Sequence, residues 1–397
     1  MKINEFFDSF QLDKSILEKS GFNPYYVEIQ SGLNDKILVE KEEKINLASN
    51  NYLGLACDLR VKQAVISATE KYGASLCGTP IATGYADLYS NLCKQLSDFS
   101  GLEDAIILPS CYQANLGLFS TIAKKDDIFL VDRQAHSSLF QGLKASGCKI
   151  RPFLHNDVSH LEKLLNRYTN CRQVYVVTES VFSTDGTIAP LNAINELCKM
   201  YDAIPIVDDS HGIGVLGREG RGILEEENVK DFAGIYTASL GKALAGFGGV
   251  ICARKELIEY LKYFFPHLVY STALPPHVLS GLSAVLDIMK IEYPAIKKRL
   301  YDYKVLIYNS LEDAGFDLVQ SRAPINSIKG GNALNTINIA KTLYHNNILT
   351  TPFVEPSVPQ GQGRVRLIAG ANLSKETINQ ACKIIRGIKK SEVLSYN

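Results

Sequence analysis

The stretch AIPIVDDSHGIGVLG, residues 203–217, runs from an apolar strand-like segment into a polar turn rich in glycine. GIYTASLGKALAGFGG at 234–249 repeats this form. Further apolar runs occur at AIILPS (105–110), DIFLVD (127–132), QVYVVTES (173–180) and GGVICA (248–253), and helix-length segments lie between them at 111–124, 137–146, 157–167 and 190–201. Strands that alternate with helices predict an α/β fold with a mostly parallel sheet covered on both faces.

The chain divides into three predicted parts. Residues 1–50 indicate an N-terminal helix and an arm ending in KINLASN, 51–285 the large α/β domain, and 286–397 a smaller C-terminal α+β domain. A long helical stretch, about 277–314, links the two domains. The small domain is expected to contain LNTINIA (334–340), YHNNILTTPF (344–353), GRVRLIA (363–369) and a closing helix at 374–390.

Composition excludes several classes of protein. Lysine plus arginine equals aspartate plus glutamate, 42 against 42, so no bulk charge attracts nucleic acid. The sequence shows neither a signal-peptide core nor an apolar run long enough to span a membrane. Its nine cysteines form no CxxC pair, which argues against a metal site and a disulfide framework and favours a cytoplasmic protein.

Polar and ionisable residues follow five of the predicted strands. Because ligands of an open parallel sheet bind beyond the carboxyl ends of its strands, these residues are expected to form one site. In chain order they are Ser110, Cys111, Tyr112, Asp132, His136, Glu179, Ser183, Asp185, Asp208, His211, Ser239 and Lys242.

Lys242 lies at a strand exit among small and apolar residues. Such surroundings would partly desolvate its amine, which lowers the pKa and frees the amine to form an imine. A surface lysine that begins a helix is the alternative reading, and the flanking glycines and Ser239 leave the two readings near parity.

Asp208 favours the first reading, because an unpaired carboxylate at the end of an apolar strand is costly to bury. A protonated pyridine nitrogen would be a suitable partner. At about 4 Å and an effective dielectric constant of about 20, that pair is worth about 4 kcal/mol, or about three pKa units of the ring nitrogen. His211 could bond the ring hydroxyl, whereas Asp209 is expected to cap a loop. The pattern favours a pyridoxal-phosphate (PLP) site on Lys242.

The phosphate of that cofactor would need hydrogen-bond donors. Ser110, Cys111 and Tyr112 begin a predicted helix and offer backbone N–H groups at the positive end of its dipole. The Ser239 hydroxyl could add another donor.

DDSHGIGVLGREGRG (208–222) followed by TASLGKALAGFGG (237–249) resembles the α-oxoamine synthases, which are PLP-dependent enzymes. The similarity begins near residue 20 and includes, in the family's order, ASNNYLGLA (48–56), SCYQANLGLF (110–119), QAHSSL (134–139), TESVFSTDGTIAPL (178–191), YSTALPP (270–276) and VPQGQGRVRL (358–367). The resemblance implies the PLP-dependent transferase fold (fold type I), that of aspartate aminotransferase, with a sheet of seven strands.

The resemblance also implies roles for matching residues. Lys242 would carry the cofactor as a Schiff base, Asp208 would pair with the pyridinium, His211 would bind the ring oxygen and His136 would stack on the ring. Arg366 would bind the amino-acid carboxylate through its planar fork. The other matches are Cys111, Tyr112 and Ser239 at the phosphate, Ser183 at the cofactor, Glu179 and Asn51 near the reacting groups, and Ser271 and Thr272 at the phosphate of a neighbouring subunit. The last two imply a homodimer with shared sites.

The implied reaction is a decarboxylative condensation of a small amino acid with an acyl thioester, carried by CoA or an acyl-carrier protein, to give an aminoketone. HNDVSHLEKLL (155–165), PHLVYSTALPP (266–276) and VTESVFSTDG (177–186) resemble the 8-amino-7-oxononanoate synthases, which use alanine and a pimeloyl thioester for biotin. Pro80, Tyr89 and Glu355 depart from the family pattern at positions expected near the acyl channel. Glycine C-acetyltransferases, serine palmitoyltransferases and signalling-molecule synthases therefore remain alternatives.

Two readings from other classes share part of this pattern. An aminotransferase would have Lys242 and Asp208, but the motifs SCYQANLG, QAHSSL and YSTALPP together are not expected in one. A non-catalytic PLP-binding protein would be favoured by loss of Lys242 or His136, and both are present.

Overall fold

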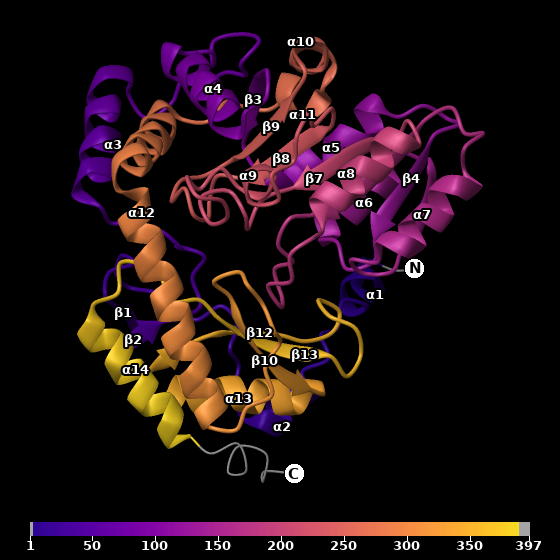
Figure 1. Cartoon of the computed structure of the whole chain (residues 1–397). Coiled ribbons are helices and arrows are strands. Elements are labelled where there is room, and N and C mark those ends of the chain that lie inside the picture. The colour runs from indigo at the N-terminus through magenta and orange to yellow at the C-terminus, as the bar shows by residue number, and fades with distance from the viewer. Residues whose placement is uncertain (1–2, 389–397) are drawn as a thin grey trace.

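A seven-stranded sheet lies at the centre of the large domain in the computed structural model, which describes residues 3–388 (Figure 1). Its strands lie in the order β3 (Asp104–Leu108), β9 (Gly249–Ala253), β8 (Ile235–Ser239), β7 (Ile204–Asp208), β6 (Val174–Glu179), β4 (Ile128–Asp132) and β5 (Lys149–Phe153). In this sheet β9 runs antiparallel to β3 and β8, and all the other pairs are parallel. The predicted mostly parallel sheet of the PLP-dependent transferase fold is confirmed.

The helices between these strands also agree with the sequence. They are α5 (Cys111–Ile122), α6 (Ser137–Ala145), α7 (Val158–Arg167) and α8 (Leu191–Met200), each within two residues of its predicted bounds. The remaining helices of this domain are α3 (Leu59–Tyr72), α4 (Asp87–Ser100), α9 (Ile223–Glu226), α10 (Lys255–Phe264) and α11 (Pro266–Val269).

The sequence analysis missed β5, which is an edge strand that pairs only with β4. Its segment KIRPF is largely exposed and contains Pro152. A proline is tolerated there because an edge strand can leave one N–H position unpaired. Because β5 contains few apolar residues, the sequence did not indicate a strand there.

The small domain contains two three-stranded sheets (Figure 1). One is β1 (Lys36–Val39), β2 (Glu42–Asn46) and β11 (Ile348–Leu349), and the other is β10 (Asn326–Gly331), β13 (Gly363–Leu367) and β12 (Thr351–Phe353). Its helices are α2 (Ser15–Ser20), α13 (Ala333–His345) and α14 (Lys375–Gly387), and the exposed helix α1 (Ile3–Asp8) precedes them in the chain. Part of the predicted closing helix, 389–390, lies outside the described residues.

The predicted segment LNTINIA belongs to helix α13. Asn332 caps this helix, because its side chain accepts a hydrogen bond from the Asn335 N–H, and Ile337, Ile339 and Leu343 are buried. Of the following stretch, Tyr344 and His345 complete α13, and its remainder supplies β11 and β12.

Helix α12 (Pro276–Asp313) joins the two domains (Figure 1). Its side chains up to Leu300 pack in the core of the large domain, and those from Tyr303 onward pack in the core of the small domain. The predicted boundary at 285/286 lies inside this helix. Within residues 3–388, no helix is long and apolar enough to cross a membrane.

Candidate active site

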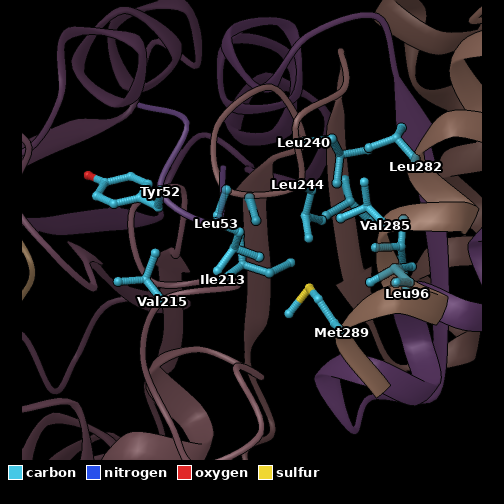
Figure 2. Packing of buried hydrophobic residues seen from close by; sticks show 14 of the residues in the cluster. Tyr52, Leu53, Leu96, Ile213, Val215, Leu240, Leu244, Leu282, Val285 and Met289 are labelled. Carbon is cyan, nitrogen blue, oxygen red and sulfur yellow. The ribbon is translucent and has the colours of Figure 1, made fainter. Parts of the chain in front are cut away.

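The turn after β8 carries Lys242. Two buried leucines anchor this turn, Leu240 and Leu244, and Figure 2 shows them close to Leu282 and Val285 of α12. Gly246 allows this packing, since a Cβ there would lie 2.4 Å from the Leu282 side chain. The backbone that presents the amine is therefore fixed by the domain core.

The Lys242 amine is partly buried and lacks a hydrogen-bond partner among the residues that the structure describes. Burial lowers its pKa, and the Asp208 carboxylate opposes this effect. A lysine in this state has a larger neutral fraction at pH 7 than an exposed lysine. It suits imine formation, as the sequence analysis predicted.

Asp208 ends β7, and its side chain is held by neutral donors. The Asn115 Nδ2 group donates to Oδ2 at 2.7 Å, and the Ser210 N–H donates to Oδ1 at 2.9 Å. The residue is 4% exposed, and no described side chain forms an ion pair with it. A buried carboxylate with no described protein cation at ion-pair distance fits a protonated pyridine nitrogen.

Asn115 was missed by the sequence analysis, although it lies within the quoted motif SCYQANLGLF. Its Oδ1 accepts a hydrogen bond from Thr237 at 2.9 Å, which fixes the amide so that Nδ2 faces Asp208. The same Nδ2 donates to the Ser138 hydroxyl at 3.0 Å. Ser138 lies 2.8 Å from His136 Nδ1, so a hydrogen-bond chain runs from Asp208 to His136.

His136 is the N-cap of α6. Its Nδ1 accepts from the Ser138 N–H at 3.2 Å, so the ring proton belongs on Nε2. Burial lowers the pKa of His136 and outweighs the attraction of Asp208. A neutral ring with a free Nε2–H is therefore expected at pH 7.

His211 is buried, and its Nδ1 lies 2.8 Å from the hydroxyl of Tyr52. Burial sets the pKa of His211 well below its usual value, and Lys242 lowers it further. In the tautomer in which Nδ1 accepts the Tyr52 proton, the neutral ring presents Nε2–H as a donor. Tyr52 lies in the quoted motif ASNNYLGLA, but its role was not predicted.

The predicted phosphate ligands lie at the start of α5. Ser110 caps this helix through its side chain, which accepts from the Gln113 N–H at 3.1 Å. The Cys111 thiol instead lies 4.0 Å from Asp208 Oδ2, and the Tyr112 ring is 46% exposed. Cys111 and Tyr112 therefore offer backbone N–H groups to an anion rather than their side chains.

Ser239 lies beside this helix start. Its N–H donates to the hydroxyl of Ser210 at 2.9 Å, and that hydroxyl donates to the Cys111 thiol at 3.4 Å. The Ser239 hydroxyl accepts from the Gly241 N–H at 3.3 Å, so its own proton is free to bind an anion.

Arg366, in β13, reaches this site from the small domain. Its Nη1 donates to the Ser183 carbonyl at 2.8 Å, and its guanidinium lies over Phe353, 4.9 Å from the ring centroid. Its buried Nε has no hydrogen-bond partner, and neither has the buried Nδ2 of Asn51. These orphaned donors fit a carboxylate that comes with the substrate.

A cavity of about 660 Å³ opens beside these groups. His136, Glu179 and Ser183 form part of its wall, together with apolar side chains that include Phe140, Phe353 and Val358. Burial raises the pKa of Glu179 well above its usual value, and the neighbouring Asp208 adds to this shift. This shift favours the protonated form of Glu179, which would act as a hydrogen-bond donor at the cavity wall.

Ser271 and Thr272 are the predicted residues that the structure does not join to this cluster. They follow α11 on the surface, next to Tyr270, which is 84% exposed. Of the three departures from the family pattern, Tyr89 lies in the core, where its hydroxyl donates to the Ile107 carbonyl at 2.6 Å. Glu355 directly precedes the cavity-lining segment 356–359.

Asp209 does not face the cavity. It is fully buried, and its Oδ2 accepts from the Ile223 N–H at 3.0 Å and from the Tyr236 hydroxyl at 2.9 Å. Burial raises the pKa of Asp209 to about 7. This side chain holds the segment 209–223 against the sheet, largely as a neutral acid.

We expect this carboxyl group to make stability depend on pH. Between about pH 4 and 7 the native protein keeps a proton that the unfolded chain loses, so the free energy of unfolding falls as pH rises, by up to on the order of 4 kcal/mol. Asp209→Asn imitates the neutral acid and should flatten this slope. Urea unfolding of both proteins from pH 4 to 8 measures it, and parallel curves would contradict the assignment.

The comparisons with known proteins agree with this geometry. The model of the aminotransferase class I and II family matches residues 42–385. An 8-amino-7-oxononanoate synthase of Petrotoga mobilis is 32% identical over 391 residues, which cover 98% of this chain and 99% of that protein. Serine palmitoyltransferase of Sphingomonas wittichii has a TM-score of 0.92 at 25% identity, covering 98% of both chains. The 8-amino-7-oxononanoate synthase of Francisella tularensis has a TM-score of 0.74 at 28% identity, covering 87% of this chain and 97% of that one.

Proposed function

We propose that this chain, a member of the aminotransferase class I and II family and, within it, of the α-oxoamine synthases, joins alanine to a pimeloyl thioester. The reaction would release carbon dioxide. The protein is a PLP-dependent acyltransferase. The observation that carries the proposal is the hydrogen-bond chain from Asp208 through Asn115 and Ser138 to His136. This hydrogen-bond chain links the Asp208 carboxylate, which suits a pyridinium nitrogen, to the neutral ring of His136, whose Nε2–H is a donor at the cavity wall.

We assign the cofactor to side chains that converge at this site. PLP, when bound, supplies the electron sink that makes the Cα–H bond acidic and allows the carboxylate to leave. Lys242 would anchor it, Asp208 would face its ring nitrogen and the Nε2–H of His211 its ring oxygen. Its phosphate would be bound by the backbone N–H groups at the start of α5 and by the Ser239 hydroxyl.

Lys242 would also move the proton. Once free, the Nζ of Lys242 would accept the Cα proton of the amino acid. Burial favours the neutral form of this amine, which is the form that can accept a proton. Arg366 would hold the amino-acid carboxylate through its unpaired Nε and its Nη groups, which fixes the Cα–H bond relative to Nζ.

His136 and Glu179 would act on the acyl donor. The Nε2–H of His136 and the neutral carboxyl group of Glu179 are donors at the cavity wall, where the thioester carbonyl would lie. Donors already aimed at the oxygen stabilise the negative charge that develops when the carbonyl is attacked. The thiol leaves with a proton, and carbon dioxide leaves from the substrate carboxylate.

Two candidate reactions differ in the acyl chain of the thioester. The relative from Petrotoga mobilis and the apolar side chains that form part of the cavity wall, such as Phe140 and Phe353, support a pimeloyl chain and hence a role in biotin synthesis. The higher TM-score of serine palmitoyltransferase from Sphingomonas wittichii, 0.92 against 0.74, favours the second candidate, in which serine is joined to a long acyl chain.

A panel assay tests the proposal. The enzyme with PLP is incubated with alanine, glycine or serine against pimeloyl-, acetyl- and palmitoyl-CoA, and free thiol and carbon dioxide are measured. Both products are expected, fastest with alanine and pimeloyl-CoA. Release of neither product with any pair, with transamination of the amino acid instead, would refute an acyltransferase. A preference for serine and palmitoyl-CoA would establish the second candidate.

Arg366→Ala is expected to raise the KM for the amino acid by about 10–100-fold. The physical reason is the loss of charge-assisted hydrogen bonds to the substrate carboxylate, worth about 1.5–3 kcal/mol. Initial rates with each substrate varied in turn measure the effect, and the KM for the acyl donor serves as the internal control. A selective effect on the acyl donor would mean that the carboxylate binds elsewhere.

We also propose a homodimer with shared sites in the cytoplasm. Exposed aromatic side chains of α10 and the segment after α11 adjoin Ser271 and Thr272; they are Tyr260, Tyr263, Phe264 and Tyr270. Aromatic residues are enriched at subunit interfaces. All nine cysteines lie within the described residues and are free, which supports a reducing compartment. Sedimentation equilibrium tests the dimer.

A further inference from the structure

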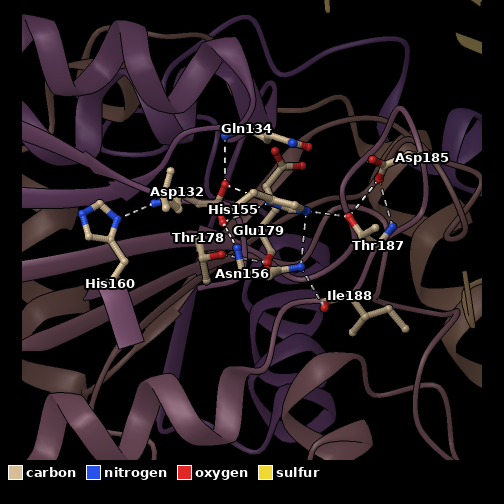
Figure 3. Close-up of polar contacts among 11 residues, drawn as sticks. Asp132, Gln134, His155, Asn156, His160, Thr178, Glu179, Asp185, Thr187 and Ile188 are labelled. Carbon is tan, nitrogen blue, oxygen red and sulfur yellow. Dashed lines mark hydrogen bonds and ion pairs between the residues drawn. The ribbon is translucent and has the colours of Figure 1, made fainter. Parts of the chain in front are cut away.

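A buried carboxylate holds the turn that leads to His136. Asp132, at the end of β4, is fully buried, and its Oδ1 accepts from the Gln134 N–H at 2.8 Å (Figure 3). Its Oδ2 accepts from the Asn156 N–H at 2.9 Å, and His155 Nδ1 lies 3.0 Å from Oδ1. Asp132 therefore ties the turn 132–136 to the turn that follows β5.

His155 extends this connection. Because its Nδ1 faces a carboxylate, Nδ1 carries the proton that is donated to Asp132. The opposite nitrogen, Nε2, lies 2.9 Å from the Thr187 hydroxyl (Figure 3). The ring packs edge-on against Phe182 with centroids 4.3 Å apart, which holds the imidazole in this orientation.

Thr187 closes the loop 183–187. Its N–H donates to Asp185 Oδ1 at 3.0 Å, and its hydroxyl oxygen lies 2.8 Å from the same carboxylate oxygen. Ser183 and Asp185 line the cavity, and the Ser183 carbonyl accepts from Arg366. This loop therefore carries part of the cavity wall and also fixes the guanidinium of Arg366.

The small domain holds the same loop from its other side. The Ser321 hydroxyl donates to the Gly186 carbonyl at 2.6 Å, and the Ser327 hydroxyl donates to the Thr184 carbonyl at 2.9 Å. Backbone hydrogen bonds between Phe182 and Thr187 and between Gly186 and Phe182 maintain the loop itself. The contact from His155 to Thr187 thus concerns the placement of the loop against the large domain, not its local fold.

We propose that His155 and Thr187 are positioning residues that set the distance between the turn carrying His136 and the loop that fixes Arg366. The inference rests on the proposed function for the roles of His136 and Arg366. Without the His155–Thr187 contact, the loop keeps its hydrogen bonds to the small domain and the bond from Asn156 Nδ2 to the Ile188 carbonyl. It loses its connection to the imidazole that is bonded to Asp132. The carboxylate-binding guanidinium then shifts relative to the groups of the large domain, and the amino acid binds less tightly.

Thr187→Val tests this with almost no change in side-chain volume, because it replaces the hydroxyl by a methyl group. The probe is alanine, titrated into the PLP-loaded enzyme while the visible absorbance of the cofactor is followed. The apparent Kd for alanine is expected to rise about tenfold, the equivalent of one or two lost hydrogen bonds. Thr187→Ser restores the hydroxyl and should bring the Kd back to within about twofold of the original.

His160→Ala is the matched control. His160 lies on the same stretch of chain, and its Nδ1 accepts from the Leu154 N–H at 2.9 Å, but it does not line the cavity and lies well apart from Thr187 (Figure 3). It should leave the Kd for alanine unchanged. Should Thr187→Val fail to fold, His155→Asn keeps the donor to Asp132, loses the contact with Thr187 and should raise the Kd in the same way.

Three results would overturn the proposal. They are an unchanged Kd in Thr187→Val, an equal rise in Thr187→Ser, and a rise that the His160→Ala control shares in proportion to its loss of thermal stability. Because alanine binding is measured without an acyl donor, failure of thiol release in the panel assay would refute the proposed reaction and leave this readout intact.

Discussion

Lys242→Ala is expected to remove the visible absorbance of the lysine-bound cofactor and to lower turnover by at least about 10²–10⁴-fold, the range that a positioned proton-transfer group contributes. The amine that would anchor PLP and the amine that would accept the Cα proton are the same nitrogen. Its pKa is lowered by burial in a turn whose backbone is fixed by Leu240 and Leu244. Absorbance of the protein reconstituted with PLP, followed by thiol release, measures both losses.

The fold should survive this substitution, since the Lys242 side chain makes no hydrogen bond to the described part of the chain, and the backbone bond from the Ala245 N–H to the Lys242 carbonyl is kept by alanine. Lys297→Ala is a suitable control, because Lys297 is also partly buried but donates to the Gly217 carbonyl, at 2.6 Å, as part of the structure. It should keep the absorbance. A Lys242→Ala protein with the original visible spectrum would exclude this residue as the cofactor anchor.

Asp208→Asn is expected to reduce turnover by about 10³-fold while PLP still binds. The substitution removes the negative charge opposite the ring nitrogen, an interaction worth about 4 kcal/mol at an effective dielectric constant of about 20. The ring then loses its proton at neutral pH and withdraws electrons less strongly. Steady-state rates and the pH dependence of the cofactor spectrum report this change.

Asp209→Asn provides the matched control for replacing a buried carboxyl group by an amide at the end of β7. Both carboxyl groups are buried, but the neighbours of Asp209 are Ile223 and Tyr236 and not the cavity. This control should retain most of the turnover at pH 7. If Asp208→Asn also kept near-normal rates, the carboxylate would not face the cofactor ring.

The sequence predicted the fold and the centre of the site because strand ends are local features. Asp208, His211 and Lys242 each follow an apolar run directly, so the topology of a parallel sheet brings them to one edge. Arg366 is different, since it comes from the small domain, and only the family motif indicated it. The exposed strand β5 was not predicted, and the segment 334–340 was not recognised as part of helix α13. In both, the run of regularly spaced apolar residues is short.

The residues that orient this centre were not predicted. Asn115 bonds to Asp208 at 2.7 Å, and the Tyr52 hydroxyl lies 2.8 Å from His211. These partners are 93 and 159 positions apart in the sequence. Such pairings arise only when the chain is folded, and an asparagine inside a helix or a tyrosine in a core is ordinary when read alone. The contact between His155 and Thr187, which links two loops, was not predicted for the same reason.

Helix α12 has a consequence for how the two domains can move. It is one continuous rod of 38 residues, about 57 Å long at the usual rise per residue, with its first part embedded in one core and its last part in the other. Rigid-body separation of the domains would require this rod to bend. Pro294 interrupts its hydrogen-bond ladder inside the part that packs in the large-domain core, near the end of that part at Leu300. Any opening of the cavity should therefore be a small rotation rather than a separation of the domains.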